Sequence, residues 1–256
     1  MKNIFINLYV FLSNNILTNN VLILFKLDHK LQLSARQWKA FSYNQTKTEQ
    51  ENAGFSHKEE VQRAIDKLKI DFIGFVNKNI SLNAEVLDVG CGPGIYLKLI
   101  RDNYGISGID VSPVMIEKAK KDLPSGIFYC GNFLEQNFSK KYKFIYSISV
   151  LEYVPASQIE YFFKKCFSLL EEGGFIFIQY PHALKFSDIL HPYRNYISYS
   201  PEKIEKCSKK YFTVISHKQF FDDRIIGKYD KKPYPTSSKD FRNGYLLIAK
   251  KKDANF

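Results

Sequence analysis

Cysteine is scarce in this sequence and is poorly spaced for a cysteine-based site. The 256-residue chain has four cysteines, which stand far apart and include no Cys-x-x-Cys pair: Cys91, Cys130, Cys166 and Cys207. This spacing predicts neither a zinc site nor a disulfide framework, and it fits a cytoplasmic protein. Long apolar runs are missing too, since Val21 to Leu27 falls short of the roughly twenty residues that span a bilayer.

The amino terminus lacks the marks of a cleavable targeting signal. Lys2 precedes an apolar run from Ile4 to Leu12, but Asn7 interrupts this run and no small-x-small cleavage site follows. We therefore expect no leader peptide and no transmembrane segment. A peripheral contact of this apolar end with a membrane surface stays open.

Acidic residues are too few to balance the basic ones. The chain has 37 Lys and Arg against 26 Asp and Glu, a formal net charge of +11. Such a balance is typical of proteins that bind nucleic acids or anionic membranes, but here the lysines are widely spread. Three local clusters are better explained as solvated surface: Lys140, Lys141 and Lys143; Lys206, Lys209 and Lys210; and Lys250 to Lys252. We do not expect a nucleic-acid partner.

Glycine is also sparse, with 13 residues, yet three of them fall within one pentapeptide. The segment Val86 to Leu97 reads VLDVGCGPGIYL, an apolar run followed by Gly-x-Gly-x-Gly and then by apolar residues at helical spacing. This pattern predicts a strand, a tight turn and a helix. Glycine is needed where φ is positive or where a ligand approaches the backbone closely. A small polar ligand is therefore expected on Gly90, Gly92 and Gly94.

The residues around the glycines narrow the choice of ligand. A dinucleotide fingerprint would place a third glycine at position 95, where the chain has Ile95, and no Gly-Lys-Ser/Thr follows to form a P-loop. A second apolar strand, Ile106 to Ile109, ends at Asp110, about twenty residues after Gly90. A carboxylate at this position can accept both hydroxyls of a ribose.

Two segments, LDVGCGPG at Leu87 to Gly94 and GIDVSP at Gly108 to Pro113, closely resemble the class I S-adenosylmethionine-dependent methyltransferases. Weaker likeness continues to Tyr180, so the resemblance covers a little under half of the chain. It implies an α/β fold, a Rossmann-like seven-stranded sandwich with a mostly parallel sheet and an antiparallel last strand. It also implies S-adenosylmethionine as the cofactor, and no metal is required.

The resemblance implies a set of cofactor-binding residues. Asp110 would hold the ribose and the glycines the methionyl end, while Asp88 would orient the loop or bond the cofactor's amino group indirectly. Asn132 stands where the family usually has an acid that holds the adenine amino group. The full expected set is Asp88, Gly90, Cys91, Gly92, Gly94, Asp110, Val111, Asn132, Phe133 and Ser147.

The segment Ser147 to Val154 resembles the part of the family that passes beneath the transferable methyl group. Two positions depart from the family: Lys143 stands where Asp is common, and Tyr153 stands where His is common. The identity of a general base is therefore open.

The expected catalytic residues are His182, Tyr153 and Glu152, with His191 as an alternative. His182 follows the fifth strand, Phe175 to Ile178, so we expect it to stand with Tyr180 at the mouth of the site, because ligands of open α/β sheets bind beyond the carboxyl ends of the strands. A histidine has the ordinary pKa that suits a base near neutrality. A purely structural role for His182 after Pro181 is equally compatible with the sequence.

The expected organisation is a helical N-terminal extension or cap over residues 1–80 and a methyltransferase domain over residues 81–256. Insertions on the substrate side are expected at about 182–200 and 220–243. Helices are predicted at Val114 to Lys121, with Ser112 as N-cap, and at Ile159 to Leu170, closed by Gly173 and Gly174. Ser200 and Pro201 begin another helix, and strands are predicted at Tyr211 to Ser216 and Tyr245 to Ala249.

The expected function is O- or N-methylation of a small-molecule acceptor with S-adenosylmethionine. One alternative is a methyltransferase that acts on RNA, DNA or another macromolecule. Against it, the Asn/Asp-Pro-Pro-aromatic motif of amino-methylating enzymes is missing, since Ser149 to Glu152 reads SVLE. The other alternative is a non-catalytic protein that binds the cofactor. The sequence does not predict an oligomeric state.

Overall fold

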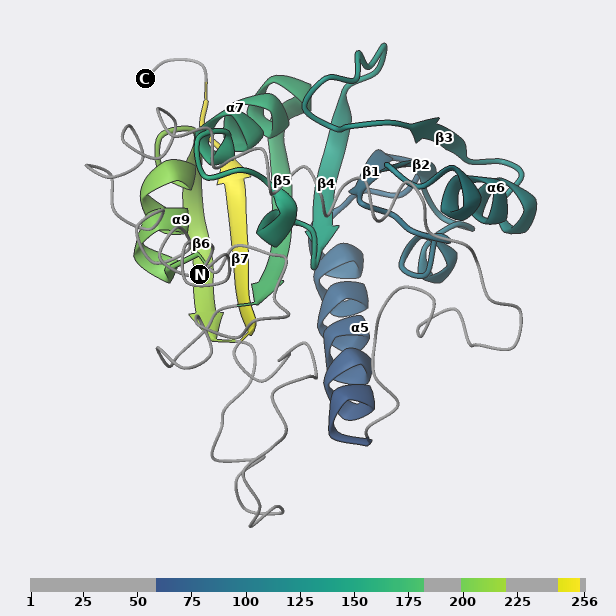
Figure 1. Ribbon diagram of the computed structural model, residues 1–256, viewed down its shortest axis with the longest axis horizontal. Helices are drawn as coiled ribbons and strands as arrows, with labels where there is room; N and C mark the ends of the chain where they lie inside the picture. The colour runs from purple at the N-terminus through teal and green to yellow at the C-terminus, as the bar shows by residue number, and fades with distance from the viewer. Residues whose placement is uncertain (1–58, 182–198, 220–243, 254–256) are drawn as a thin grey trace, which may run out of the picture.

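The computed structural model describes residues 59–181, 199–219 and 244–253, which contain one seven-stranded sheet (Figure 1). The strand order is β3-β2-β1-β4-β5-β7-β6. Strand β7 runs antiparallel to β5 and β6, and the other neighbouring strands are parallel, as predicted. The strands are β1 Glu85–Val89, β2 Gly105–Asp110, β3 Ile127–Cys130, β4 Tyr142–Ile148, β5 Leu170–Pro181, β6 Phe212–Gln219 and β7 Gly244–Lys251.

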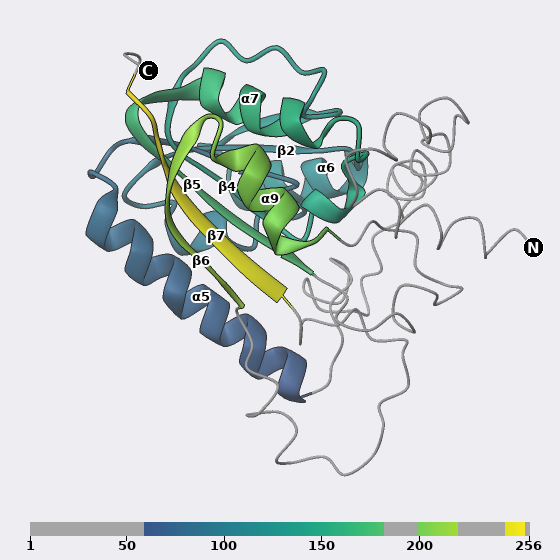
Figure 2. The ribbon, with the colours of Figure 1, turned by 90° about the vertical axis from the view of Figure 1, so that its left-hand side faces the viewer.

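Helices cover both faces of the sheet. Helix α5 lies on one face, and α7 and α9 lie on the other (Figure 2). Ile116 of α6 belongs to the same apolar core as α5. The helices are α5 Glu59–Asn79, α6 Pro113–Asp122, α7 Ile159–Leu169 and α9 Pro201–Ser208. The helices predicted at Val114 to Lys121, at Ile159 to Leu170 and after Ser200 are confirmed.

Helix α5 lies within the predicted N-terminal extension and shares a core with the sheet. Its apolar residues recur at helical spacing and are buried: Ala64, Ile65, Leu68, Phe72 and Val76. Phe72 packs edge-on against rings of β4 and β5, with ring centroids 4.7 Å from Tyr146 and 5.6 Å from Phe177. Burial of one such ring contributes roughly 1.5–3 kcal/mol. Residues 1–58 of the extension lie outside the described part.

The opposite face is covered by α7 and α9. Ile159, Phe162, Phe163 and Cys166 of α7 form a buried stripe against β4 and β5, which confirms the predicted amphipathic helix. Ser200 caps α9, since its Oγ accepts a hydrogen bond from the Lys203 N–H at 3.3 Å.

Two local predictions were wrong. The residues after the glycine loop form a single 3-10 turn, η2 Leu97–Leu99, instead of an α-helix. Gly173 and Gly174 do not end helix α7, which is followed directly by β5. They lie within β5, where the pairing with β4 shifts register between Tyr142 and Phe144, and Gly173 has a φ of 64°.

The carboxyl ends of β1, β2, β4 and β5 meet at one edge of the sheet. The amino-terminal part of α5 extends past the end of β4 at this edge (Figure 1). Pro181 of β5 pairs there with Gly244 of β7, and Gln219 of β6 pairs with Tyr245. Within the described ranges, no helix combines the length and the apolar character needed to cross a bilayer. The predicted insertion at 220–243 lies outside the described residues, as does the one at about 182–200 except for Tyr199 and Ser200.

Candidate functional site

The glycine loop follows β1 at this edge of the sheet. Gly90, Gly92 and Gly94 have φ values of 77°, 52° and 82°, in the left-handed region that favours glycine. A Cβ at Gly90 would lie 2.1 Å from Val150 Cγ2, so this glycine is also required for packing. A Cβ at Gly92 would meet no atom of the described residues within 4 Å. With respect to this part of the chain, the backbone at Gly92 therefore faces open space, where a ligand can approach it.

Asp110, the last residue of β2, anchors the loop. Its Oδ2 accepts a hydrogen bond from the Gly92 N–H at 2.9 Å, and its Oδ1 accepts one from the Ser112 N–H at 2.8 Å. The N–H groups of Gly90 and Cys91 donate to the Ile109 carbonyl at 2.7 and 3.0 Å. Burial raises the pKa of Asp110, and the bonds from Ser112 and Gly92 oppose this shift. Each carboxylate oxygen still has a lone pair that can accept a ribose hydroxyl.

Asp88 of β1 lies beneath the loop in an enclosed setting. Its exposed fraction is 3%, and it pairs in register with Tyr146 of β4. Burial raises the pKa of Asp88 well above its usual range, and the nearby Tyr146 hydroxyl opposes the shift. Neither Tyr146 nor its neighbour Tyr96 stands out in the sequence, because apolar packing alone accounts for tyrosines in these patterns.

Asn132 and Phe133 follow β3. The Asn132 Oδ1 accepts a hydrogen bond from the Leu134 N–H at 3.0 Å, and its Nδ2 donates to Glu135 Oε1 at 2.9 Å, so its side chain shapes the local turn. Phe133 is buried, with its ring centroid 5.3 Å from that of Phe162. The expected contact of Asn132 with adenine stays a prediction.

Side-chain hydrogen bonds connect the end of β4 to both neighbouring strands. The Ser147 Oγ donates to the Val89 carbonyl of β1 at 3.1 Å, and the Ser149 Oγ donates to the Gln179 Oε1 of β5 at 2.9 Å. Ser149 has a φ of 55°, a strained conformation for a residue with a Cβ. The next residue, Val150, is the one that contacts Gly90. The strained end of β4 therefore supports the glycine loop. No local pattern in the sequence predicts this contact, because Val150 and Gly90 lie on different strands.

The expected catalytic residues fall partly outside the described residues. His182 and His191 both lie there. Glu152 and Tyr153 lie in the 3-10 turn η3 Leu151–Tyr153, directly after β4, where Glu152 is buried and Tyr153 is half-buried. The catalytic roles of all these residues stay predictions.

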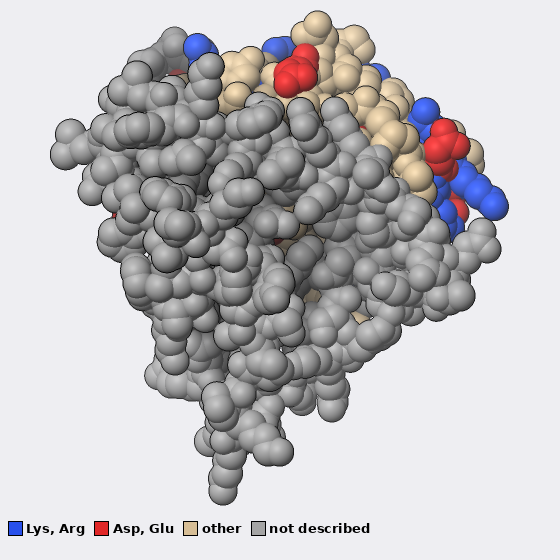
Figure 3. Space-filling view, viewed as in Figure 1, with Lys and Arg blue, Asp and Glu red and all other residues tan. Residues whose placement is uncertain are grey.

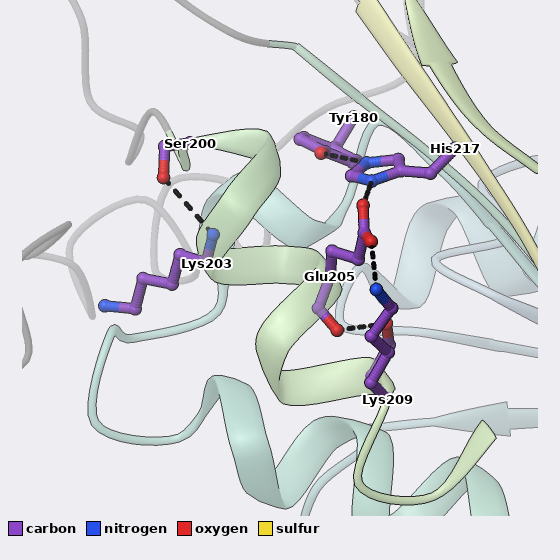
Figure 4. Close-up of polar contacts among 7 residues, drawn as sticks. Tyr180, Ser200, Lys203, Glu205, Lys209 and His217 are labelled. Carbon is purple, nitrogen blue, oxygen red and sulfur yellow. Dashed lines mark hydrogen bonds and ion pairs between the residues drawn. The ribbon is translucent and has the colours of Figure 1, made fainter. Parts of the chain in front are cut away.

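Tyr180 does not stand at the mouth of the site, contrary to expectation. It is fully buried, and its hydroxyl lies 2.7 Å from Nε2 of His217 on β6 (Figure 4). His217 Nδ1 lies 3.0 Å from Glu205 Oε2 on α9, and Lys209 Nζ lies 2.5 Å from the other oxygen of that carboxylate. These contacts lower the pKa of Glu205. The chain of bonds joins β5, β6 and α9.

The strand order and the residues around the glycine loop identify the class of protein. The sheet order, the glycine loop after β1 and the acid at the end of β2 are those of a class I methyltransferase domain. The sequence matches the methyltransferase domain family over residues 57–222, and the chain belongs to this family.

Curated relatives match part of the chain. A trans-aconitate 2-methyltransferase of Agrobacterium fabrum is 33% identical over 101 residues, which cover 38% of this chain and 39% of the relative. A carboxy-S-adenosyl-L-methionine synthase of Campylobacter fetus is 31% identical over 132 residues, 47% of this chain and 56% of the relative. The matched region thus spans about half or less of these relatives.

Solved structures match more of the chain at low identity. The N-methyltransferase NodS of Bradyrhizobium japonicum, in complex with S-adenosyl-L-homocysteine, has a TM-score of 0.61 and is 13% identical, with 88% of this chain and 100% of that chain covered. The magnesium protoporphyrin IX methyltransferase of Synechocystis has a TM-score of 0.60 at 14% identity, with 87% and 97% covered. At this identity the likeness shows the fold alone.

Proposed function

We propose that this protein binds S-adenosylmethionine at the glycine loop and transfers its methyl group to a small-molecule acceptor by O- or N-methylation. The observation that carries the proposal is the open backbone at Gly92, hydrogen-bonded to Asp110 at the ligand-binding edge of the sheet. The names of the curated relatives support a small acceptor, because several of them are trans-aconitate 2-methyltransferases.

The residues at this edge fit such a cofactor. When bound, the cofactor supplies a methyl group on a positively charged sulfur, and the neutral thioether that remains after transfer is a good leaving group. Asp110 would accept the ribose hydroxyls, and the Gly92 backbone would lie against the ligand without a side chain between them. Ser147 and Ser149 would hold the end of β4 in place beside the loop. Positioning of two reactants can lower a barrier by roughly 7–11 kcal/mol, so a strong base is not essential.

The first test is the affinity for S-adenosylhomocysteine, the demethylated cofactor. We expect binding to the wild-type protein and at least tenfold weaker binding to Asp110→Ala, because a hydrogen bond to a charged group is worth roughly 1.5–3 kcal/mol. Isothermal titration calorimetry measures both affinities. The control is Asp102→Ala, a carboxylate whose side chain is 86% exposed. Equal affinities for the wild-type and Asp110→Ala proteins would remove Asp110 from the site.

The second test identifies the acceptor class. Formation of S-adenosylhomocysteine from S-adenosylmethionine is measured with pools of small carboxylic acids, alcohols and amines. Transfer RNA and an acyl carrier protein are included as macromolecular acceptors. Turnover with a small pool supports the proposal, while turnover with a macromolecule alone contradicts it. Binding without any turnover favours a non-catalytic protein.

A further inference from the structure

The chain forms a single hydrogen-bonded turn directly after β3, beside the end of β2. The N–H groups of Glu135 and Gln136 donate to the Asn132 carbonyl at 3.1 and 3.0 Å, which closes the turn. The Gly131 N–H donates to the Asp110 carbonyl at 2.9 Å. The turn therefore begins next to the acid that is expected to hold a ribose, and a base joined to that ribose can reach it.

Lys165 of α7 holds the far end of this turn. Its Nζ donates hydrogen bonds to the Leu134 carbonyl at 2.8 Å and to the Gln136 carbonyl at 2.7 Å. The last carbonyls of a helical turn have no partner within the turn, so they need a donor from elsewhere. Within the described residues, both hydrogen-bond acceptors of Lys165 are backbone carbonyls, so this side chain fixes the path of the chain.

Aromatic rings hold the ammonium group of Lys165 in place. The side chain is half-buried, and its Nζ lies 5.6 Å from the ring centroid of Phe133 and 5.8 Å from that of Phe138. A cation within about 6 Å of a ring face is attracted to it. The Phe133 ring also packs against Phe162 of α7, with centroids 5.3 Å apart. Helix α7 and the turn after β3 are thus joined by both polar and aromatic contacts.

The two ends of the turn are held by different side chains. At its start, the Asn132 Oδ1 uses one lone pair to accept from the Leu134 N–H at 3.0 Å. An amide oxygen has a second lone pair, which can accept from the amino group of a base. The direction of that lone pair depends on the shape of the turn, and Lys165 fixes the other end of the turn.

We propose that Lys165 is a positioning residue for the cofactor's base: by holding the turn after β3, it orients Asn132 so that an amino group on the base is favoured over an oxo group. The proposal rests on the proposed function, because it takes S-adenosylmethionine as the ligand. It adds a residue on α7 that has no contact with the ligand itself. The oxo group of a hypoxanthine base has no hydrogen to donate to the Asn132 oxygen.

The test compares two ligands that differ in one group of the base, S-adenosylhomocysteine and S-inosylhomocysteine. Titration calorimetry measures the affinity of each protein for both. We expect the wild-type protein to bind the adenine ligand roughly threefold to tenfold more tightly, the effect of one hydrogen bond. The ratio of the two affinities is the readout. A variant that only weakens the fold lowers both affinities alike and leaves this ratio unchanged.

Variants of Lys165 separate its ammonium group from its apolar stem. Lys165→Met keeps an unbranched stem against the two rings, and we expect it to abolish the preference for adenine. Lys165→Arg should retain most of the preference, because a guanidinium group can donate to both carbonyls. The matched control is Lys164→Met, the preceding residue of α7, which is exposed and should keep the wild-type ratio.

A second substitution tests whether Lys165 acts through Asn132. Asn132→Ala should abolish the preference by itself, and adding Lys165→Met should change the ratio no further. A preference that survives in Asn132→Ala would overturn the proposed route.

The outcomes distinguish this inference from the proposed function. Failure of the wild-type protein to bind either ligand contradicts both. Binding of S-adenosylhomocysteine with no preference in the wild type, or with the wild-type ratio retained in Lys165→Met, overturns only the role of Lys165. An equal loss of preference in Lys164→Met also overturns it. If Lys165→Met does not fold, Lys165→Gln decides, because its shorter side chain cannot reach both carbonyls: an unchanged ratio overturns the proposal.

Discussion

At the scale of single residues, the ligand-binding edge is held by side chains that connect neighbouring strands. Ser147 connects β4 to β1, Ser149 connects β4 to β5, and Asp110 connects β2 to the glycine loop. Each bond satisfies a polar group at least half-buried, where a lost partner is costly. Ser149 also carries backbone strain, which persists only where the surroundings impose it.

Because of this strain, two substitutions of Ser149 should change the stability of the protein to different extents. Ser149→Ala keeps the Cβ at a φ of 55° and leaves the buried Gln179 oxygen without its donor, so we expect a loss of about 1–3 kcal/mol in the free energy of unfolding. Ser149→Gly also loses the bond but relieves strain worth roughly 1–2 kcal/mol. Urea unfolding of both variants measures the difference. An alanine variant as stable as the glycine variant would show that the strain is negligible.

At the scale of elements, the glycine loop has two kinds of glycine. Gly90 is enclosed by Val150, whereas Gly92 faces open space. Both have positive φ, so an added Cβ strains the backbone at either position. Only at Gly90 does it also collide with the protein.

The contrast predicts different defects for two alanine variants. Gly90→Ala should lower the melting temperature strongly, because the Cβ would lie 2.1 Å from Val150 Cγ2. Gly92→Ala should cost only the backbone strain, roughly 1–2 kcal/mol, yet should lose affinity for S-adenosylhomocysteine. Thermal unfolding and calorimetry measure the two effects. Full affinity in a folded Gly92→Ala protein would contradict a ligand lying against this backbone.

Helix α9 is joined to the sheet by an ionisable chain. Because His217 and Lys209 lower the pKa of Glu205, its bonds stabilise the fold above the ordinary pKa of a glutamate. This contribution is lost as the pH falls through the lowered pKa in the folded protein.

Glu205→Gln should therefore reduce stability near neutrality and reduce its dependence on pH in the acidic range. The measurement is urea unfolding across that range. Glu117→Gln, an exposed glutamate on α6, is the control and should follow the wild type. A pH dependence of Glu205→Gln equal to that of the wild type would show that the bonds to His217 and Lys209 contribute nothing to stability.

At the scale of the whole molecule, many of the lysines lie beside acidic side chains that offset their positive charge. On the face shown in Figure 3, described basic and acidic side chains lie next to one another along the upper and right-hand rim. Lysines from all three clusters of the sequence form ion pairs: Lys140 with Glu85 at 2.7 Å, Lys209 with Glu205 at 2.5 Å, Lys210 with Glu160 at 2.6 Å and Lys251 with Glu172 at 2.8 Å.

We therefore expect weak binding to RNA and DNA. Paired lysines neutralise few phosphates, so affinity should be low and should vanish as salt rises to about 200 mM. Fluorescence anisotropy with labelled transfer RNA and duplex DNA at several salt concentrations measures this. Tight, sequence-selective binding that survives such salt would contradict the prediction and would favour a nucleic-acid substrate.

Features of the fold that local chemistry controls can be predicted from the sequence. Apolar periodicity predicted the strands and the helices α6, α7 and α9, and the spacing of Gly90 and Asp110 predicted the loop and its partner strand. These features depend on residues near one another in the chain, or on the number of residues between the ends of two successive parallel strands. Their positions follow from propensity, from caps such as Ser200, and from the need of glycine for positive φ.

The tertiary structure alone decided which distant side chains meet. Tyr146 reaches Asp88 because β4 pairs with β1, and Tyr180 reaches His217 across β7. Sequence periodicity assigns a residue to a buried face but does not say which polar group lies opposite, since that depends on strand order and register. For the same reason, the glycines at 173 and 174, which resemble a helix cap locally, lie within β5, where its pairing with β4 shifts register.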